Sequence, residues 1–432
     1  MPERRAISGA QSPEIVRDLL SSSGLNRLGI LRKLAISPLP LAPGATLTWL
    51  LRRAFGPVGG AAPEPEPREA VALARALGLA GMVCGRLPMA QLEAELGVVG
   101  ARELAFQHLQ VRAANRVLAA ALQTVIEVAG REGIQLVLLK QAALARAGVV
   151  QEGQRDARDV DVLVSPADAN TLWRKLREAG FRPFNVVGGD FHLTPLVLAS
   201  GACVEIHHHL WGVRLGSDEP ATLAALVEAE LTAHDASAPH VHVPSRDLLS
   251  AHALVHGLAQ HMTSPADYAP LRVFSDLFHL KATRADANAI QRLLRGDLDL
   301  ESVHAALEIA QALEAGSSFS ELGAGVSELL AHVLAASTDV RYARALRAHR
   351  LLELRQSGGL LQAARRLFQG HKGPAVEDSV AYQDGGLGER AREAWEIALG
   401  VVACAQLRKR RASAVTSSTT SGNSSNPVRP SE

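Results

Sequence analysis

The chain has 432 residues, of which 21% are charged, and its 45 lysines and arginines against 44 aspartates and glutamates give a net charge of +1. This balance excludes recruitment of nucleic acid or anionic membrane by the overall field of the protein, which needs a clear excess of positive charge. A hydrophobic content of 47% excludes a disordered chain, and three widely spaced cysteines exclude a disulfide framework. We therefore expect a globular protein of roughly two or three domains, with free thiols in a reducing compartment.

The N-terminal part of the chain is predicted to be helical after a linker. Residues 56–67, GPVGGAAPEPEP, combine proline, glycine and glutamate, which favours an extended segment. Residues 1–67 are accordingly predicted to form an N-terminal arm that ends in this linker. Alanine and leucine recur at helical spacing over 68–86 and again over about 91–132, so residues 68–132 are predicted to form a helical region ahead of the core.

A mixed α/β core is predicted over residues 133–245. The run IQLVLLK at 134–140 is typical of a short strand, residues 141–149 return to a helical pattern, and 159–164 form a second strand-like run. Ser165 and the proline after it predict the start of a helix. Three further strand-like runs, FRPFNVV, FHLTPLVLA and ACVEIHHHL, complete a small mixed sheet with helices on one side, so the expected fold class is α+β.

The rest of the chain is predicted to be helical up to a polar tail. A helical bundle is expected over 246–366, where Asp276 either faces a cleft or is solvated, and a helical extension over 367–412. Residues 413–432 are rich in serine and threonine, which predicts disorder. No apolar run reaches the roughly 20 residues of a membrane-spanning helix, and the N-terminal sequence lacks the apolar region of a signal peptide. We therefore expect no transmembrane segment and a cytoplasmic location.

Two carboxylates stand one residue apart at the start of the second predicted strand, in the run RDARDVDVLVSP. Because side chains alternate between the faces of a strand, Asp159 and Asp161 point the same way, while the valines between and after them point into a core. Carboxylates this close repel each other, and a hard cation such as Mg²⁺, which prefers oxygen ligands, relieves that repulsion. The alternative is a solvated strand end whose acids pair with Arg155 and Arg158.

A third acid is available in the run ACVEIHHHLW, where alternation places Glu205, His207 and His209 on one face. Three carboxylates from neighbouring strands would form the ligand set for one or two Mg²⁺ ions that clamp a triphosphate. Zinc is an alternative for the histidines, although at most two of the adjacent ones converge. His252 and His256 lie four residues apart without the glutamate of an HExxH motif, and this favours packing or a wall of the cleft over zinc.

Three motifs, taken in order, resemble the nucleotidyltransferase fold of the DNA polymerase beta superfamily, and within it the uncharacterised bacterial nucleotidyltransferase family proteins. The motifs are VLLKQAAL at 137–144, RDVDVLV at 158–164 and VEIHHHLW at 204–211. The resemblance covers roughly residues 68–285, with helical parts on both sides. It implies a nucleotidyltransferase core flanked by helical regions.

This resemblance also implies roles for individual residues. Asp159 and Asp161 would bind the metal, and Glu205 would be a third metal ligand or the group that activates an acceptor hydroxyl. These three residues are the predicted catalytic and metal-binding set. The residues expected to bind the nucleotide are Lys140, Gln141, Arg158 and His207.

One position departs from the family pattern, because the glycine that follows the lysine in the family is Gln141 in this chain. A glycine there lets phosphate approach the backbone amides at a helix N-terminus. A glutamine either crowds that approach or replaces it by donating its own amide hydrogens.

The resulting hypothesis is an enzyme that transfers an NMP group from an NTP, with ATP expected, to an acceptor hydroxyl on a small molecule or a protein. Mg²⁺ is the expected cofactor, with Mn²⁺ as the alternative. Long nucleic acid is disfavoured as an acceptor because no large basic stripe is present. The alternatives are a catalytically degenerate nucleotide-binding or protein-interaction module on the same fold and, third, a zinc hydrolase.

Overall fold

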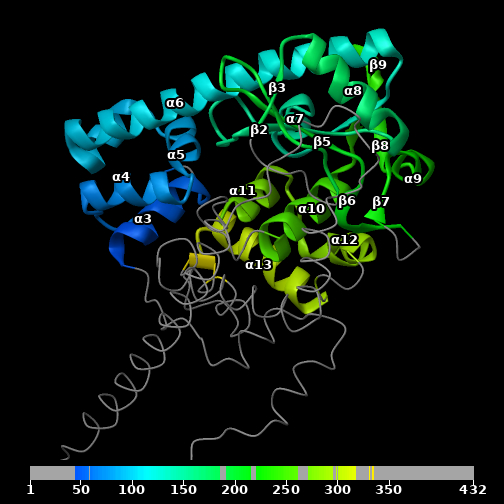
Figure 1. The fold of residues 1–432 in the computed structure, drawn as a ribbon. Helices are drawn as coiled ribbons and strands as arrows, with labels where there is room; N and C mark the ends of the chain where they lie inside the picture. The colour runs from blue at the N-terminus through cyan, green and yellow to red at the C-terminus, as the bar shows by residue number, and fades with distance from the viewer. Residues whose placement is uncertain are drawn as a thin grey trace, which may run out of the picture.

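The computed structural model describes a mixed β-sheet, with helices before and after it in the chain (Figure 1). The described residues are 44–57, 59–184, 191–215, 220–260, 271–294, 298, 300–317, 330, 333 and 334. The expected α+β class is confirmed by the alternation of helices and a seven-stranded mixed sheet. The extension predicted over 367–412 and the tail predicted over 413–432 lie outside the described residues.

Within the described residues, four helices precede the sheet. They are α3 (Ala45–Ala54), α4 (Pro67–Ala76), α5 (Ala80–Arg86) and α6 (Met89–Glu132). Helix α6 runs from the other N-terminal helices to the sheet (Figure 1), and Gly97, with φ of 70°, breaks its regular geometry near the start. Helix α3 was not expected, because it lies within the segment predicted to be an arm. It buries Trp49 and Leu50 against α4 and α5, so this segment contributes to the core.

Helix α5 packs directly on the loop that leads into strand β2 (Asp159–Leu163). A Cβ at Gly81 would lie 1.9 Å from the carbonyl oxygen of Gly153, whereas a Cβ at Gly85 would meet only side-chain atoms of Gln154 at 3.4 Å. The backbones of α5 and the loop therefore approach each other at Gly81 more closely than any side chain allows.

Gly81→Ala is expected to lower the free energy of unfolding by about 1–3 kcal/mol, because backbone must move to accept the methyl group. Gly85→Ala in the same helix is the matched control. It should cause no loss, because alanine favours the helix by roughly 1 kcal/mol over glycine. Urea denaturation of both variants measures the difference, and equal effects at the two positions would contradict the close approach.

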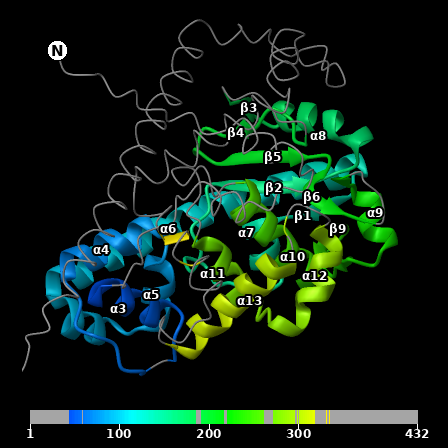
Figure 2. The ribbon, with the colours of Figure 1, turned by 90° about the horizontal axis from the view of Figure 1, so that it is seen from below.

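The main sheet has the strand order β3-β4-β5-β2-β1-β9-β8, and Figure 2 shows the strands from β3 to β9 side by side. Its strands are β1 (Leu136–Leu138), β2 (Asp159–Leu163), β3 (Arg182–Pro183), β4 (Leu196–Val197), β5 (Cys203–His207), β8 (Thr232–Asp235) and β9 (Ala238–Pro244). Strand β2 runs parallel to β5 and antiparallel to β1, while β1 runs parallel to β9. The strands β8 and β9 were not predicted. A separate two-stranded sheet pairs β6 (Leu210–Arg214) with β7 (Pro220–Ala221).

Two helices cover one face of the main sheet. Helix α8 (Pro166–Glu178) begins as predicted, because the Ser165 side chain accepts a hydrogen bond from the Asp168 amide and a proline follows it. Helices α6 and α8 contact β5, and Val160, Val162, Val204 and Ile206, which alternate with the acids along β2 and β5, are at most 2% exposed. The acids are thereby directed to the opposite face. The short helices α7 (Lys140–Arg146) and α9 (Leu223–Glu228) follow β1 and β7.

The C-terminal helices lie on the other side of the sheet from α6 (Figure 1). They are α10 (Arg246–Leu254), α11 (Arg272–His279), α12 (Ala287–Leu294) and α13 (Leu300–Ala315). A π-helical segment, Val255–Gln260, continues α10, and the 3-10 turn Arg284–Asp286 leads into α12. No described helix is long and apolar enough to cross a membrane.

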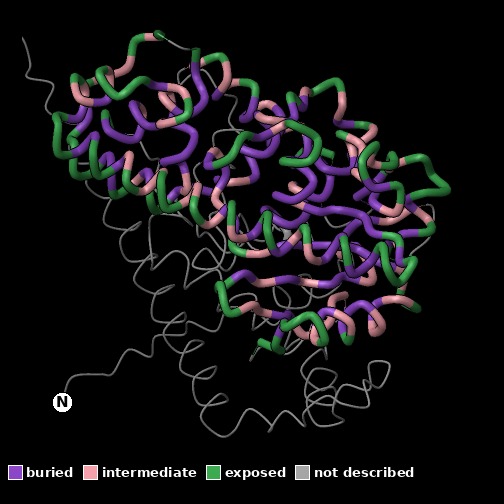
Figure 3. Tube along the Cα trace, turned by 90° about the horizontal axis from the view of Figure 1, so that it is seen from above, coloured by how far each residue is buried: buried purple, intermediate pink, exposed green. Residues whose placement is uncertain are grey.

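Buried residues run through the central strands and the inward sides of the helices (Figure 3). They form one hydrophobic cluster that includes residues of α3, the sheet and α11, so the N-terminal and C-terminal helices share a core with the strands. Cys84 and Cys203 are free thiols, as expected from the sequence. Burial raises the pKa of each thiol to about 12, which makes both poor nucleophiles.

Candidate functional site

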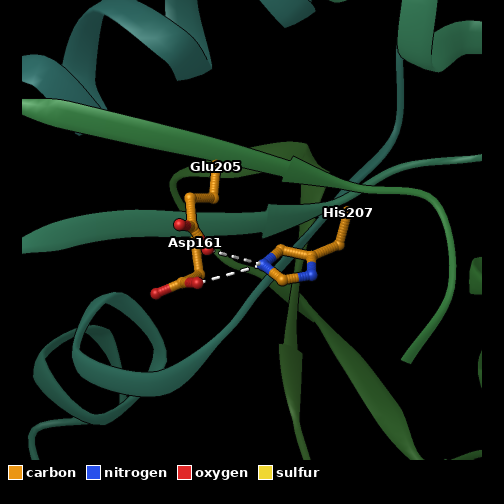
Figure 4. Close-up of side chains that lie close together, drawn as sticks. All are labelled: Asp161, Glu205 and His207. Atoms are coloured by element: carbon orange, nitrogen blue, oxygen red, sulfur yellow. Dashed lines mark hydrogen bonds and ion pairs between the residues drawn. The ribbon is translucent and has the colours of Figure 1, made fainter. Parts of the chain in front are cut away.

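The register between β2 and β5 brings the predicted acids together. The two strands are parallel neighbours in which Asp161 lies directly across from Glu205 and Leu163 lies across from His207. Since residues two apart on a strand share a face, Glu205 and His207 point to the same side as Asp161 (Figure 4). Asp159 shares this face at the start of β2, across from Cys203.

One ring nitrogen of His207 faces two of the carboxylates (Figure 4). Its Nε2 is 3.0 Å from Oδ1 of Asp161 and 3.6 Å from Oε2 of Glu205. The side chains of Asp161 and His207 are only 1% and 5% exposed. One ligand atom from each of Asp161, Glu205 and His207 lies within 4.8 Å of the others, which is a spacing that could hold a metal ion.

Lys140 contributes a cation to the same cluster. It is the first residue of α7, and its Nζ lies 2.7 Å from Oδ1 of Asp161. Its backbone has φ of 47°, in the left-handed region that residues other than glycine adopt uncommonly. Such a conformation persists where surrounding contacts fix it, and the ion pair with Asp161 is one such contact.

The pKa values of Asp159 and Asp161 are shifted in opposite directions. Burial raises the pKa of Asp161, but the Lys140 ammonium and the hydrogen bond from His207 outweigh burial and hold it well below its usual range. Burial and the charge of Asp161 raise the pKa of Asp159 to about 6, against the attraction of Lys140. Burial lowers the pKa of His207, but its hydrogen bonds to Asp161 and Glu205 prevail and raise it. Asp159 is the carboxylate left under-compensated, because burial and the charge of Asp161 outweigh the attraction of Lys140 and Arg155.

A pocket of about 240 Å³ opens beside this cluster. Its walls carry four basic side chains, two acids, four histidines and two aromatic rings in addition to an alanine. The lining residues are Lys140, Arg155, Ala157, Arg158, Asp159, Phe191, His192, Glu205, His207, Trp211, His252, His256 and Arg272. Cations and aromatic rings around a group of acids can hold a polyphosphate and a planar base together.

Two ion pairs fix the arginine wall of the pocket. Arg155 donates to both carboxylate oxygens of Asp276 in α11, at 2.6 and 2.9 Å, and Arg272 of the same helix pairs with Asp156. Asn115 of α6 holds the loop from behind by donating to the carbonyl of Arg155. Arg155 thus forms its buried ion pair with Asp276, while its charge also opposes the rise in the pKa of Asp159.

Six of the predicted site residues lie in the cluster or in the pocket beside it, and Gln141 does not. Asp161, Glu205, His207 and Lys140 meet in one cluster, and Asp159 and Arg158 line the adjoining pocket. Gln141 is 8% exposed, lies outside the pocket lining, and leaves its side-chain oxygen without a hydrogen-bond partner. The role in nucleotide binding that the resemblance implies for Gln141 stays a prediction.

Sequence reasoning missed several pocket residues, namely Arg155, Phe191, His192, Trp211 and Arg272. No local pattern marks them, because they come from loops, from strand β6 and from α11. His252 and His256 line the pocket, and burial lowers the pKa of His252 to about 3, so this ring is neutral. Within the described part of the chain, these two histidines belong to no group of three metal-ligating side chains, whereas His207 does.

A family model described as an uncharacterised nucleotidyltransferase matches residues 63–313, which is more than half of the chain. No curated protein and no solved structure matches. The matched range contains the sheet, the acid cluster and the pocket. The chain therefore belongs to the family of uncharacterised nucleotidyltransferases.

Proposed function

We propose that this protein transfers an NMP group from an NTP to an acceptor hydroxyl, with release of pyrophosphate, at the pocket beside β2 and β5. The observation that carries the proposal is the convergence of Asp161 and Glu205 from parallel strands, next to a pocket with basic walls, inside the range of the nucleotidyltransferase family model. Carboxylates beside cations are the pairing that metal-dependent phosphoryl chemistry needs.

The donor set fits a divalent cation. Asp161 and Glu205 offer carboxylate oxygens from adjacent strands, and Asp159 adds a third at the pocket wall. The raised pKa of Asp159 has its cause in burial and in uncompensated negative charge, which a further cation would relieve. A bound Mg²⁺ or Mn²⁺ would supply charge stabilisation to the phosphate oxygens in the displacement.

The chain's own side chains would position the nucleotide. Lys140 and Arg158 stand at the pocket wall near the acids and would contact phosphate oxygens, while Trp211 and Phe191 offer flat surfaces for a base. Glu205 is 22% exposed, against 1% for Asp161. Glu205 is thus the more accessible of the two and the better placed to take a proton from an acceptor hydroxyl.

The acceptor in this proposal is a small molecule or an exposed protein hydroxyl, and ATP is the expected nucleotide. The near-neutral net charge of +1 gives no long basic track for a nucleic-acid strand. The pocket supplies basic groups for one polyphosphate, and two of its arginines are already paired with Asp276 and Asp156.

The direct test is calorimetric titration of each of the four common NTPs into the full chain, with and without Mg²⁺ or Mn²⁺. Pyrophosphate release and mass spectrometry of the reaction mixture would then identify a nucleotidylated product. Metal-dependent binding of at least one NTP and a mass increase of one NMP on an acceptor are expected. No metal-dependent binding of any NTP would overturn the proposal.

Glu205→Gln is expected to lower turnover more than nucleotide affinity, because the amide keeps the shape but cannot accept a proton. Turnover should fall by roughly 10²–10⁴-fold, the usual size of a general-base contribution. Steady-state rates and NTP dissociation constants measured on the same preparations separate the two effects. An equal loss in both would assign Glu205 to nucleotide positioning instead.

A catalytically degenerate nucleotide-binding module is the second candidate, and one contact favours it. The Lys140 ammonium lies 2.7 Å from Asp161 and already gives a metal-ligating oxygen a positive partner. In such a module NTP would bind without any need for a divalent cation and without product. The calorimetric titrations with and without metal distinguish the two candidates.

A further inference from the structure

We propose that His207 is a metal ligand of this site and makes it selective for Mn²⁺, or a similar transition-metal cation, over Mg²⁺. This inference rests on the proposed function, because it concerns the cation used by the same carboxylates. It departs from the nucleotide-contacting role that the family resemblance implies for His207.

The inference rests on the position of the His207 imidazole. Nε2 of His207 is directed at the two carboxylates rather than toward the pocket alone, at 3.0 Å from Asp161 and 3.6 Å from Glu205 (Figure 4). The ligand atoms of the three residues lie within 4.8 Å of one another. A cation placed among these atoms would have two oxygens and one nitrogen available as ligands. A cation held by Asp161 and Glu205 therefore meets the imidazole nitrogen as well.

The ring is held in this orientation by its neighbours. Phe191 stacks on it, with ring centroids 5.8 Å apart and an interplanar angle of 19°. The backbone is also fixed, because His192 forms a β-bridge with His207 and the His208 amide donates to the carbonyl of Phe191. With a side chain only 5% exposed, His207 has little room to turn its nitrogen away from the acids.

The type of ligand atom determines whether the site prefers Mn²⁺ or Mg²⁺. Mg²⁺ prefers oxygen ligands in a near-ideal octahedron, whereas imidazole nitrogen suits transition metals, which bind mixed nitrogen and oxygen sites more tightly. On ligation, the Nε2–H hydrogen that faces the carboxylates is lost to solvent as a proton, and the nitrogen lone pair forms the bond to the cation. Mg²⁺ gains little from this exchange, because nitrogen is a poor ligand for it.

Electron paramagnetic resonance of Mn²⁺ bound to the full chain tests the ligand directly. Spin-echo modulation spectra of the wild-type protein are expected to show coupling to a directly bound imidazole nitrogen. His207→Gln keeps a polar side chain but offers an amide oxygen in its place, and it should lose the nitrogen coupling. His209→Gln changes a histidine two residues away that is not part of the donor group, and it should keep the coupling.

Competition titrations measure the selectivity. The wild-type protein should bind Mn²⁺ at least about tenfold more tightly than Mg²⁺, and His207→Gln should lose most of that difference. Bound Mn²⁺ without nitrogen coupling, or an unchanged preference in a folded His207→Gln protein, would overturn the inference while leaving the proposed function standing. Absence of any divalent binding, with or without NTP, would overturn both.

Discussion

Asp161→Asn is expected to reduce nucleotidyl transfer by at least about 10²–10³-fold, the scale on which removal of one preorganised electrostatic group acts. Asp161 is the centre of the cluster, because it contacts both Lys140 and His207 and lies across from Glu205. The asparagine keeps the shape but removes the charge that would hold a cation. Metal-dependent NTP binding should be lost together with the rate, as measured by calorimetry and by pyrophosphate release.

The same substitution should leave the protein folded. Lys140 loses its closest partner but is still attracted by Asp159 and Glu205, so its buried ammonium is not left without compensating charge. Thermal unfolding monitored by circular dichroism checks this point. Asp247→Asn, which changes an acid in the first turn of α10 outside the pocket, serves as the control and should retain activity. An Asp161→Asn protein that melts early but binds metal and NTP normally would make Asp161 a structural residue.

Asp276→Asn is expected to lower the free energy of unfolding by about 3–5 kcal/mol, the usual result of breaking a buried ion pair by removing one charge. Arg155 and Asp276 are joined by two hydrogen bonds, and both side chains are 5% exposed. The substitution removes the charge of the carboxylate that accepts both hydrogen bonds from the buried Arg155 guanidinium. Urea denaturation followed by circular dichroism gives the change in the free energy of unfolding.

An exposed ion pair provides the comparison. Lys281 lies 2.6 Å from Glu314, but these side chains are 62% and 44% exposed. Glu314→Gln should therefore cost less than about 1 kcal/mol, because solvent screens the pair. Similar losses in the two variants would show that burial does not set the strength of the Arg155–Asp276 pair. Because Arg155 lines the pocket, Asp276→Asn should also weaken NTP binding.

The sequence by itself determined the local features of this protein. Alternation along β2 and β5 predicted that Asp161 and Glu205 would each face away from a valine-rich core, and side-chain chemistry predicted the helix start at Ser165. The order of three motifs predicted the family. These features depend on residues a few positions apart, because interactions between near neighbours in the sequence determine strand alternation and helix caps. The catalytic roles assigned to Asp159, Asp161 and Glu205 stay predictions.

Only the tertiary structure decided how distant residues meet. The pairing of β2 with β5 places Asp161 across from Glu205 and brings His207 to the acids. The sequence of either strand alone does not specify its partner strand or the register between them. Arg155 pairs with Asp276, which lies 121 positions away in α11, and the pocket walls combine strands, loops and helices that are far apart in the sequence. The burial of Gln141, at 8% exposed and outside the pocket lining, is likewise a tertiary feature that its local sequence does not reveal. Such contacts arise from the free energy of packing the whole chain, which no single stretch of sequence records.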